Sequence, residues 1–308
     1  MKKIIKGFMI FLGGIIGLVL VALLSLNILK FAIYSDFYGI TENVCINPGL
    51  NDGFVPQGLT VSEAEDLIIT SGYMKDGSAS RLYITNTKNE SRFVKLQKNG
   101  EAFAGHLGGV ALSGDVLYLA DGGKIYTVDL DKVVNSDVVE VGEGTKVNNS
   151  ASFVFADSNY VYVGEFHDGG QYVTKHEIDT NDGKYFAICS VYAKEDLTTP
   201  VMIYSIRNKV QGFCVTKSGT IVLSTSYGLA SSEYFIYEAK DIRNDNTTYE
   251  GAPLYVLDNY TKMIQGPAMA EGLSVANEKV YCMTESACNK YIFGKFFFAN
   301  KIFAFDIK

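Results

Sequence analysis

The residues best suited to chemistry stand at the ends of short apolar segments. Gln57, His106, Gln211 and Glu271 lie at the openings of segments that continue with glycine and apolar residues. A second set follows other apolar segments and consists of Tyr73, Asp121, Glu165, His167, Tyr227 and Glu285. Carboxylate and amide oxygens are preferred ligands of Ca²⁺, and imidazoles act as general bases near neutral pH. Whether these groups meet depends on the elements that carry them.

One pattern recurs along the chain, a small or polar residue followed by an apolar strand. It is found at residues 57–61, 108–112, 151–155, 211–215 and 271–275. Each copy is followed by a turn and a second apolar strand, at residues 67–70, 116–120, 160–163, 221–224 and 280–283. Repetition at intervals of tens of residues indicates stacked or radial units.

Further strands complete each unit. Third strands are predicted at residues 81–85, 124–128, 171–173, 234–237 and 301–305, and fourth strands at 92–96, 138–141, 185–191 and 254–257. The fifth unit ends without a fourth strand, and residues 40–46 have the length and character to complete it. We therefore predict an all-β fold, a β-propeller of five four-stranded blades whose last blade is completed by the N-terminal strand. Six blades are the alternative, because residues 192–210 form a long connector that could hide a strand pair.

Residues 1–33 are predicted to contain a cytoplasmic Lys cluster and a transmembrane signal-anchor, and residues 34–308 the propeller domain. Lys2, Lys3 and Lys6 precede residues 8–29, which contain no charge and are long enough to span a bilayer. The Lys cluster predicts a cytoplasmic N-terminus and an extracytoplasmic propeller, as in a single-pass protein of the cell membrane. A cleaved signal peptide is the alternative, although its apolar stretch is usually shorter.

Charge and cysteine content narrow the possibilities further. The net charge of −7 argues against nucleic acid as a partner, because a nucleic-acid-binding surface must be basic. Five cysteines cannot all pair within one chain. Cys45 and Cys282 would share the last blade, so a disulfide between them is a hypothesis.

The predicted topology brings the reactive residues together. The first strand of each blade lines the central channel, and its start lies on the same face as the end of the antiparallel second strand. We expect that face to be a channel mouth in which the residues divide into three sets. Ligand would be bound by Gln57, Tyr73, Gln211, Tyr227 and Glu285, a metal would be held by Glu271, Glu165 and Asp121, and His106 or His167 would be the catalytic base. Structural roles are the alternative: Gln57 and Gln211 would bond the backbone of neighbouring blades, and Asp121 would stabilise a turn.

Several short motifs resemble a known superfamily. The openings Gln57-Gly58 and Glu271-Gly272, together with residues 105–109 and 121–123, resemble the propellers that include gluconolactonase-like, paraoxonase-like and NHL-type proteins. More closely, the chain resembles membrane-anchored or secreted propellers of Gram-positive bacteria. For lactonase-like families the resemblance implies a channel-bound divalent cation, usually Ca²⁺, and lactonase or esterase activity. Gln57 and Gln211 depart from that pattern, since carboxylates are expected at those positions.

Three functions follow from these expectations. The first is binding of a small ligand or glycan at the channel mouth. The second is a divalent-cation-dependent lactonase, esterase or glycoside hydrolase, the last of which needs a pair of carboxylates. The third is a protein-interaction scaffold, because propellers serve all three purposes.

Overall fold

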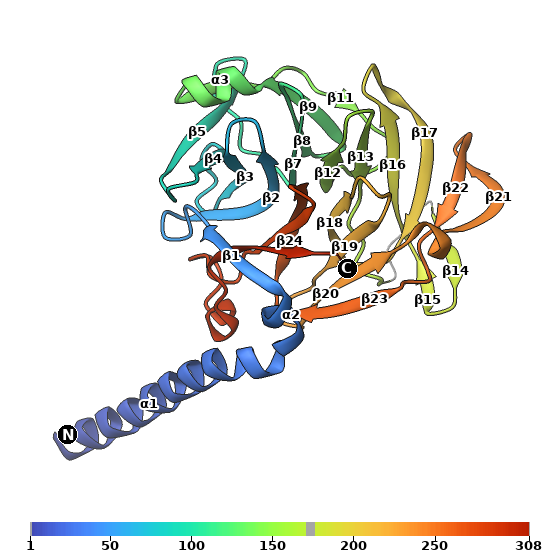
Figure 1. Cartoon of the computed structure of the whole chain (residues 1–308). Coiled ribbons are helices and arrows are strands. Elements are labelled where there is room, and N and C mark those ends of the chain that lie inside the picture. The colour runs from blue at the N-terminus through green and yellow to red at the C-terminus, as the bar shows by residue number, and fades with distance from the viewer. Residues whose placement is uncertain (1, 171–175, 308) are drawn as a thin grey trace.

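The computed structural model describes residues 2–170 and 176–307 and contains five β-sheets around a central channel (Figure 1). This confirms the predicted five-bladed propeller. The first four strands of each blade, counted from the channel outward, are as follows. They are β2 (Phe54–Ser62), β3 (Leu67–Met74), β4 (Arg81–Asn86) and β5 (Ser91–Lys98); β7 (Gly109–Ser113), β8 (Val116–Asp121), β9 (Lys124–Asp129) and β11 (Thr145–Lys146); β12 (Phe153–Ala156), β13 (Tyr160–Gly164), β16 (Ala187–Ala193) and β17 (Asp196–Ile206); β18 (Val210–Val215), β19 (Ile221–Thr225), β20 (Ser232–Tyr237) and β23 (Lys262–Gly266); and β24 (Ala270–Ala276), β25 (Lys279–Thr284), β26 (Lys301–Asp306) and β1 (Thr41–Ile46).

The ring is latched by the two ends of the propeller domain. β1 pairs antiparallel with β26, with Thr41 opposite Phe305 and Ile46 opposite Lys301. The N-terminal strand therefore supplies the outer edge of the fifth blade, as the sequence predicts. An open sheet edge is thereby covered.

Strand assignments within the second blade differ from the prediction. Residues 138–141 were expected to be its fourth strand, but β10 (Val138–Glu140) pairs in parallel with β5 of the first blade. The helix α3 (Leu130–Asn135), capped by the Asp129 side chain, carries the chain back to that blade. The two-residue strand β6 (Glu101–Ala102) also joins β5. Strand composition alone does not reveal which blade a strand joins.

The third blade is larger than predicted. Its third strand was expected at residues 171–173, of which nothing is described, and the structure forms this strand from β16, which the sequence suggested as the fourth. The supposed connector at residues 192–210 contains β17 instead. Residues 254–257 were assigned to the fourth blade, yet β22 (Ala252–Val256) pairs in parallel with β17 and extends the third blade together with β21 (Arg243–Tyr249).

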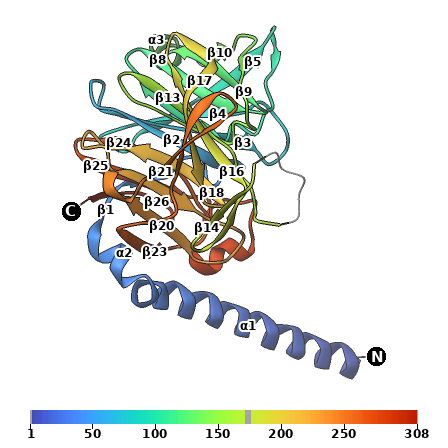
Figure 2. The same cartoon turned by 90° about the vertical axis from the view of Figure 1, so that its right-hand side faces the viewer.

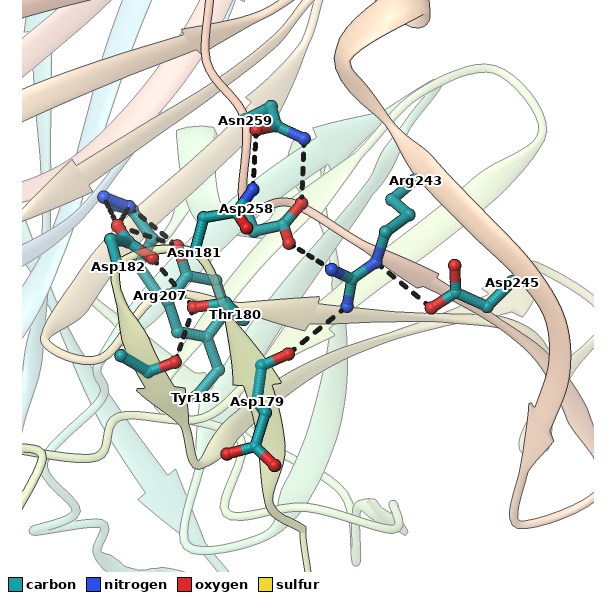
Figure 3. A network of polar contacts seen from close by, with 11 residues as sticks. Asp179, Thr180, Asn181, Asp182, Tyr185, Arg207, Arg243, Asp245, Asp258 and Asn259 are labelled. Atoms are coloured by element: carbon teal, nitrogen blue, oxygen red, sulfur yellow. Dashed lines mark hydrogen bonds and ion pairs between the residues drawn. The ribbon is translucent and has the colours of Figure 1, made fainter.

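Two arginines hold the outer part of the third blade together (Figure 3). Arg207 forms an ion pair with Asp182, which lies between β14 (Ile178–Thr180) and β15 (Gly183–Tyr185). Arg243 forms ion pairs with two aspartates. One is Asp258, whose side chain is fully buried, and the other is Asp245, whose Oδ2 lies 3.1 Å from Arg243 Nε. The short helix η1 (Ala239–Asp241) lies just ahead of β21. This network fixes segments that extend beyond the regular blade.

The N-terminal helix α1 (Lys2–Ile33) projects from the propeller (Figures 1 and 2). Residues 3–22 are exposed along their whole length. This helix is long and apolar enough to cross a membrane. The following helix α2 (Ser35–Ile40) buries Phe37 completely, with the ring stacked on Tyr234 and edge-on to Phe303. α2 thus attaches α1 to the fourth and fifth blades.

Glycines allow the inner strands to approach one another around the channel. A side chain at Gly272 would place its Cβ 2.7 Å from the Leu59 nitrogen, and one at Gly58 would place it 2.4 Å from the Val110 nitrogen. A Cβ at Gly212 would come similarly close to the backbone nitrogen of Leu273. The inner strands contact each other in the closed order β2, β7, β12, β18, β24 and back to β2. The recurring glycine of the repeat is therefore explained by blade packing.

The hypothesis of a disulfide between Cys45 and Cys282 is wrong. Cys45 lies opposite Ile302 of β26, and Cys282 lies opposite Phe303 of the same strand. β26 therefore runs between them, and two steps between strands of about 4.8 Å exceed the Cα separation that a disulfide permits. Both cysteines are buried free thiols.

Replacing Gly272 tests the importance of this packing. We expect Gly272→Ala to lower the free energy of unfolding by about 1–3 kcal/mol or more, because the added methyl group meets rigid backbone. Gly142→Ala is the matched control, since nothing lies within 4 Å of a Cβ there. Denaturant unfolding of both variants measures the difference. Equal stability of the two variants would contradict the packing argument.

Candidate functional site

Three inner strands open with a β-bulge, and each bulge carries one of the predicted mouth residues. The pairing register shifts between Pro56 and Gly58, between Val210 and Gly212, and between Ala270 and Leu273. The residues inside these irregularities are Gln57, Gln211, and Glu271 with Gly272. A bulge adds a residue to one strand and turns its side chain out of the regular alternation. The same local irregularity therefore aims three polar side chains at one place.

That place is a cavity of about 420 Å³ at the channel mouth. The structure brings together there six of the predicted site residues, namely Gln57, His106, Asp121, Gln211, Glu271 and Glu285. Phe166 and Tyr291 supply aromatic wall, and Ser150 and Ser152 supply hydroxyl groups. None of the described residues that line the cavity is Lys or Arg. The mouth is therefore polar and acidic.

Glu271 and Glu285 form a buried pair of carboxyl groups. They hydrogen-bond to each other, and their exposed fractions are only 3% and 7%. Burial raises the pKa of Glu271 well above its usual value, and the neighbouring Glu285 raises it further. Burial also raises the pKa of Glu285, although Lys290 and hydrogen bonds oppose this effect. Two carboxylates at such close range disfavour each other's ionisation, so we expect the pair to hold one proton between them.

Gln57 extends this pair into a chain of hydrogen bonds. Its Nε2 donates to Glu285 Oε2 over 2.9 Å, and its Oε1 lies 2.6 Å from His106 Nε2. Because the amide oxygen can only accept, His106 carries a proton on Nε2. Nε2 also donates to the Pro56 carbonyl, which belongs to the same strand, so this bond is not the bond to a neighbouring blade's backbone that the structural alternative expects.

His106 lies at the rim of the cavity and is held by Tyr73. Their rings stack with centroids 4.6 Å apart. The pKa of His106 is lowered mainly because burial removes water from around the imidazole, while the negative charge of Asp121 acts in the opposite direction. Tyr73 is itself not among the lining residues; its hydroxyl contacts Tyr291 and accepts from Lys290. It therefore positions His106 from behind.

Asp121 combines a place in the cavity with a structural bond. Its Oδ1 accepts a hydrogen bond of 2.9 Å from the backbone nitrogen of Leu107. Leu107 has a positive φ of 54°, which is unusual for a residue other than glycine. The carboxylate thus fixes the loop that presents His106, a structural role other than the stabilisation of its own turn that the alternative expects.

Glu165 and His167 lie apart from the other predicted residues. They line a neighbouring cavity of about 380 Å³, which shares Ser150 and Phe166 with the mouth. Glu165 accepts a hydrogen bond from the Ile188 nitrogen, and burial raises its pKa. Tyr227 is 54% exposed and stacks on Phe166 at 6.3 Å. These residues flank the mouth without meeting Glu271.

Tyr291 is the mouth residue that sequence reasoning missed. It lines the cavity and hydrogen-bonds Glu285, although it belongs to the connection between β25 and β26 and to no part of the repeat. The only signal available was its place shortly after Glu285, at the end of a second strand.

The acids predicted to hold a metal do not lie together in one cavity. Across residues 2–170 and 176–307, no three His, Cys, Asp or Glu side chains converge as a metal site requires. Glu165 is in the other cavity, and Asp121 is engaged with Leu107. The described donor set does not match the expected Ca²⁺ ligands, and calcium binding stays a prediction.

Comparisons with known proteins concern the fold alone. Family models and curated proteins give no match to this sequence. Among solved structures, the chain is similar to Myxococcus xanthus glutaminyl cyclase, with 10% identity, a TM-score of 0.48, and coverage of 87% of this chain and 95% of that one. It is also similar to a PQQ-bound aldose sugar dehydrogenase from Streptomyces coelicolor, with 14% identity, a TM-score of 0.44, and coverage of 80% and 77%. It is also similar to BamB from Moraxella catarrhalis, with 10% identity, a TM-score of 0.33, and coverage of 82% of this chain and 83% of that one.

All three are β-propeller proteins, and the similarity concerns the fold alone, so the superfamily predicted from the motifs stays a prediction. The finer resemblance to Gram-positive membrane-anchored propellers stays a prediction. At these levels of identity, nothing about the activity of those proteins is transferred to this chain.

The carboxyl pair makes stability depend on pH. Between about pH 4.3, the usual value for Glu, and the raised pKa values, the folded protein holds more protons than the unfolded chain. The contribution of the pair is therefore fully present below about pH 4.3 and is lost as the pH rises, by up to about 1.4 kcal/mol per pH unit for each proton. Glu271→Gln removes one ionisable group and should flatten this decline.

Unfolding by denaturant at several pH values measures the effect. We expect the free energy of unfolding of Glu271→Gln, relative to the unmodified chain, to increase from pH 4.5 to neutrality by about 1 kcal/mol or more. Glu101→Gln, at an exposed position of β6, is the control and should follow the unmodified chain. If the unfolding free energy of Glu271→Gln had the same pH dependence as that of the unmodified chain, the two carboxyl groups would not share a proton.

Proposed function

We propose that the protein is a membrane-anchored, extracytoplasmic β-propeller that binds a small polar ligand at its channel mouth. The observation that carries this proposal is the buried carboxyl pair Glu271–Glu285, which lines a cavity of about 420 Å³ and is continued by Gln57 and His106. Buried polar groups cost free energy unless they are hydrogen-bonded, and a polar ligand in the cavity would complete the hydrogen bonds of the side chains that line it.

The chemistry of the walls indicates the class of ligand. A carboxylic acid beside a carboxylate can donate one hydrogen bond and accept others, which suits hydroxyl or amino groups. The carboxylates lack a lining Lys or Arg, so an anionic ligand would be repelled. Phe166 and Tyr291 offer aromatic faces of the kind that stack on sugar rings. A neutral or cationic sugar fits these requirements.

The anchoring part of the proposal is supported by α1. Its 31-residue apolar span from Lys3 to Ile33 leaves residues 3–22 free of contact with the propeller. Lys2, Lys3 and Lys6 at its start favour a cytoplasmic N-terminus. The propeller domain would then lie outside the cell membrane.

Hydrolysis is less well supported than binding. Glycosidases keep their two carboxyl groups about 5–9.5 Å apart, whereas Glu271 and Glu285 are within hydrogen-bonding distance of each other. A cation-dependent lactonase or esterase would need a ligand set that the described acids do not form. The scaffold hypothesis leaves the polar mouth without a role.

Binding of three matched sugars tests the proposal. The probes are N-acetylglucosamine, glucosamine and glucuronate, which are neutral, cationic and anionic. With the full chain in detergent, we expect titration calorimetry to detect the first two, and glucuronate to bind at least roughly tenfold more weakly because of the acidic walls.

Two variants locate the binding site. Glu285→Gln should weaken binding of the neutral and cationic sugars by roughly tenfold, the effect of losing about one charge-assisted hydrogen bond. Glu101→Gln should bind as the unmodified chain does. Absence of binding by all three probes, tightest binding of glucuronate, or equal affinity of Glu285→Gln would each overturn the proposal.

A further inference from the structure

The connection between β25 and β26 exposes large apolar side chains. We call residues 290–298 the η2 loop, after the short helix η2 (Phe293–Phe297) that it contains. Ile292 is 80% exposed and Phe293 66% exposed. Neighbouring apolar residues exposed to this extent usually mark an interaction surface.

The η2 loop is fixed against the N-terminal helix. Asn27 Nδ2 donates to the carbonyl of Lys295 over 2.9 Å, and the Phe298 nitrogen donates to Asn27 Oδ1 over 3.1 Å. Lys30 Nζ also donates to the Phe298 carbonyl. Both views show η2 lying beside α1 (Figures 1 and 2). The loop and helix thus form one unit.

The apolar surface of the loop continues along the last part of α1. Four side chains there are 47–70% exposed, namely Ile28, Leu29, Phe31 and Ile33. The uncharged segment of α1, residues 8–29, is about 33 Å of helix, which matches the hydrocarbon core of a bilayer. A bilayer spanned by this segment therefore ends near Leu29, beside the η2 loop that Asn27 and Lys30 hold.

We propose that the η2 loop inserts Ile292 and Phe293 into the interface of the bilayer that α1 spans, forming a second membrane contact. This inference rests on the anchoring part of the proposed function. Aromatic and aliphatic side chains flanked by Lys290 and Lys295 are the composition favoured at a membrane interface. One lipid surface accounts for both exposed apolar segments.

The contact would bring the channel mouth to the membrane surface. Tyr291, which immediately precedes Ile292, lines the mouth and hydrogen-bonds Glu285. One edge of the mouth would thus lie at the level of the lipid headgroups. Hydroxyl-bearing molecules at that surface would be within reach of the carboxyl pair.

The absence of tryptophan from the sequence makes a direct test possible. The full chain carrying Phe293→Trp is reconstituted in phosphatidylcholine vesicles with or without bromine on the acyl chains, a short-range quencher. We expect blue-shifted emission and loss of roughly half its intensity in brominated vesicles, because interfacial segments bury their apolar face about 5–10 Å deep. Ile292→Trp serves as a second reporter if Phe293→Trp does not fold.

Tyr160→Trp is the matched control. Tyr160 is 37% exposed at the start of β13, and second strands end at the mouth, so it lies toward the opposite face. Its emission should not change with brominated lipid.

Flotation of the same vesicles separates the two claims. If the protein floats but Phe293→Trp is not quenched, the loop contact is overturned while the anchor stands. Blue-shifted emission without quenching also overturns it, because protein rather than lipid would then cover the loop. Failure to float with the vesicles would overturn the anchor and the loop contact together.

Discussion

The close approach of the five inner strands is the constraint on which the rest of the structure depends. Gly58, Gly212 and Gly272 let the backbone of one blade lie directly against that of the next. Ser71 and Ser224, on the second strands, add hydrogen bonds from their hydroxyl groups to the carbonyls of Leu107 and Glu271 in adjacent blades. The residue just before each glycine lies at a bulge, so the packing that closes the ring also directs side chains into the channel mouth.

The mouth owes its chemistry to burial of two carboxyl groups in this rigid frame. Glu271 belongs to an inner strand, and Glu285 follows the second strand of the same blade, so neither can withdraw into solvent without disturbing the ring. The proximity of the two carboxyl groups favours one shared proton. Gln57, on the first blade, hydrogen-bonds both Glu285 and His106 and so connects the pair to the imidazole. A site built across blades is preorganised, which reduces the entropy lost when a ligand binds.

The sequence predicted the propeller, its blade number and the latch because each depends on a local repeat. It also identified Gln57, Gln211, Glu271 and Glu285 as neighbours, since strand direction determines which ends share a face. The sequence did not predict strand pairing between segments that are far apart in the chain. β10 and β22 pair in parallel with strands of other blades, although their composition is that of ordinary fourth strands. Tyr291 was missed because a loop outside the repeat has no pattern to place it.

Infrared spectroscopy of the carboxyl groups tests the central claim most directly. A protonated carboxylic acid has a C=O stretch distinct from the bands of a carboxylate. The account predicts that the full chain at neutral pH shows such a band, that Glu271→Gln lacks or shifts it, and that Glu101→Gln keeps it unchanged. Absence of any protonated-acid band in the unmodified chain would contradict the account, because both carboxyl groups would then be ionised and a cation would have to lie between them.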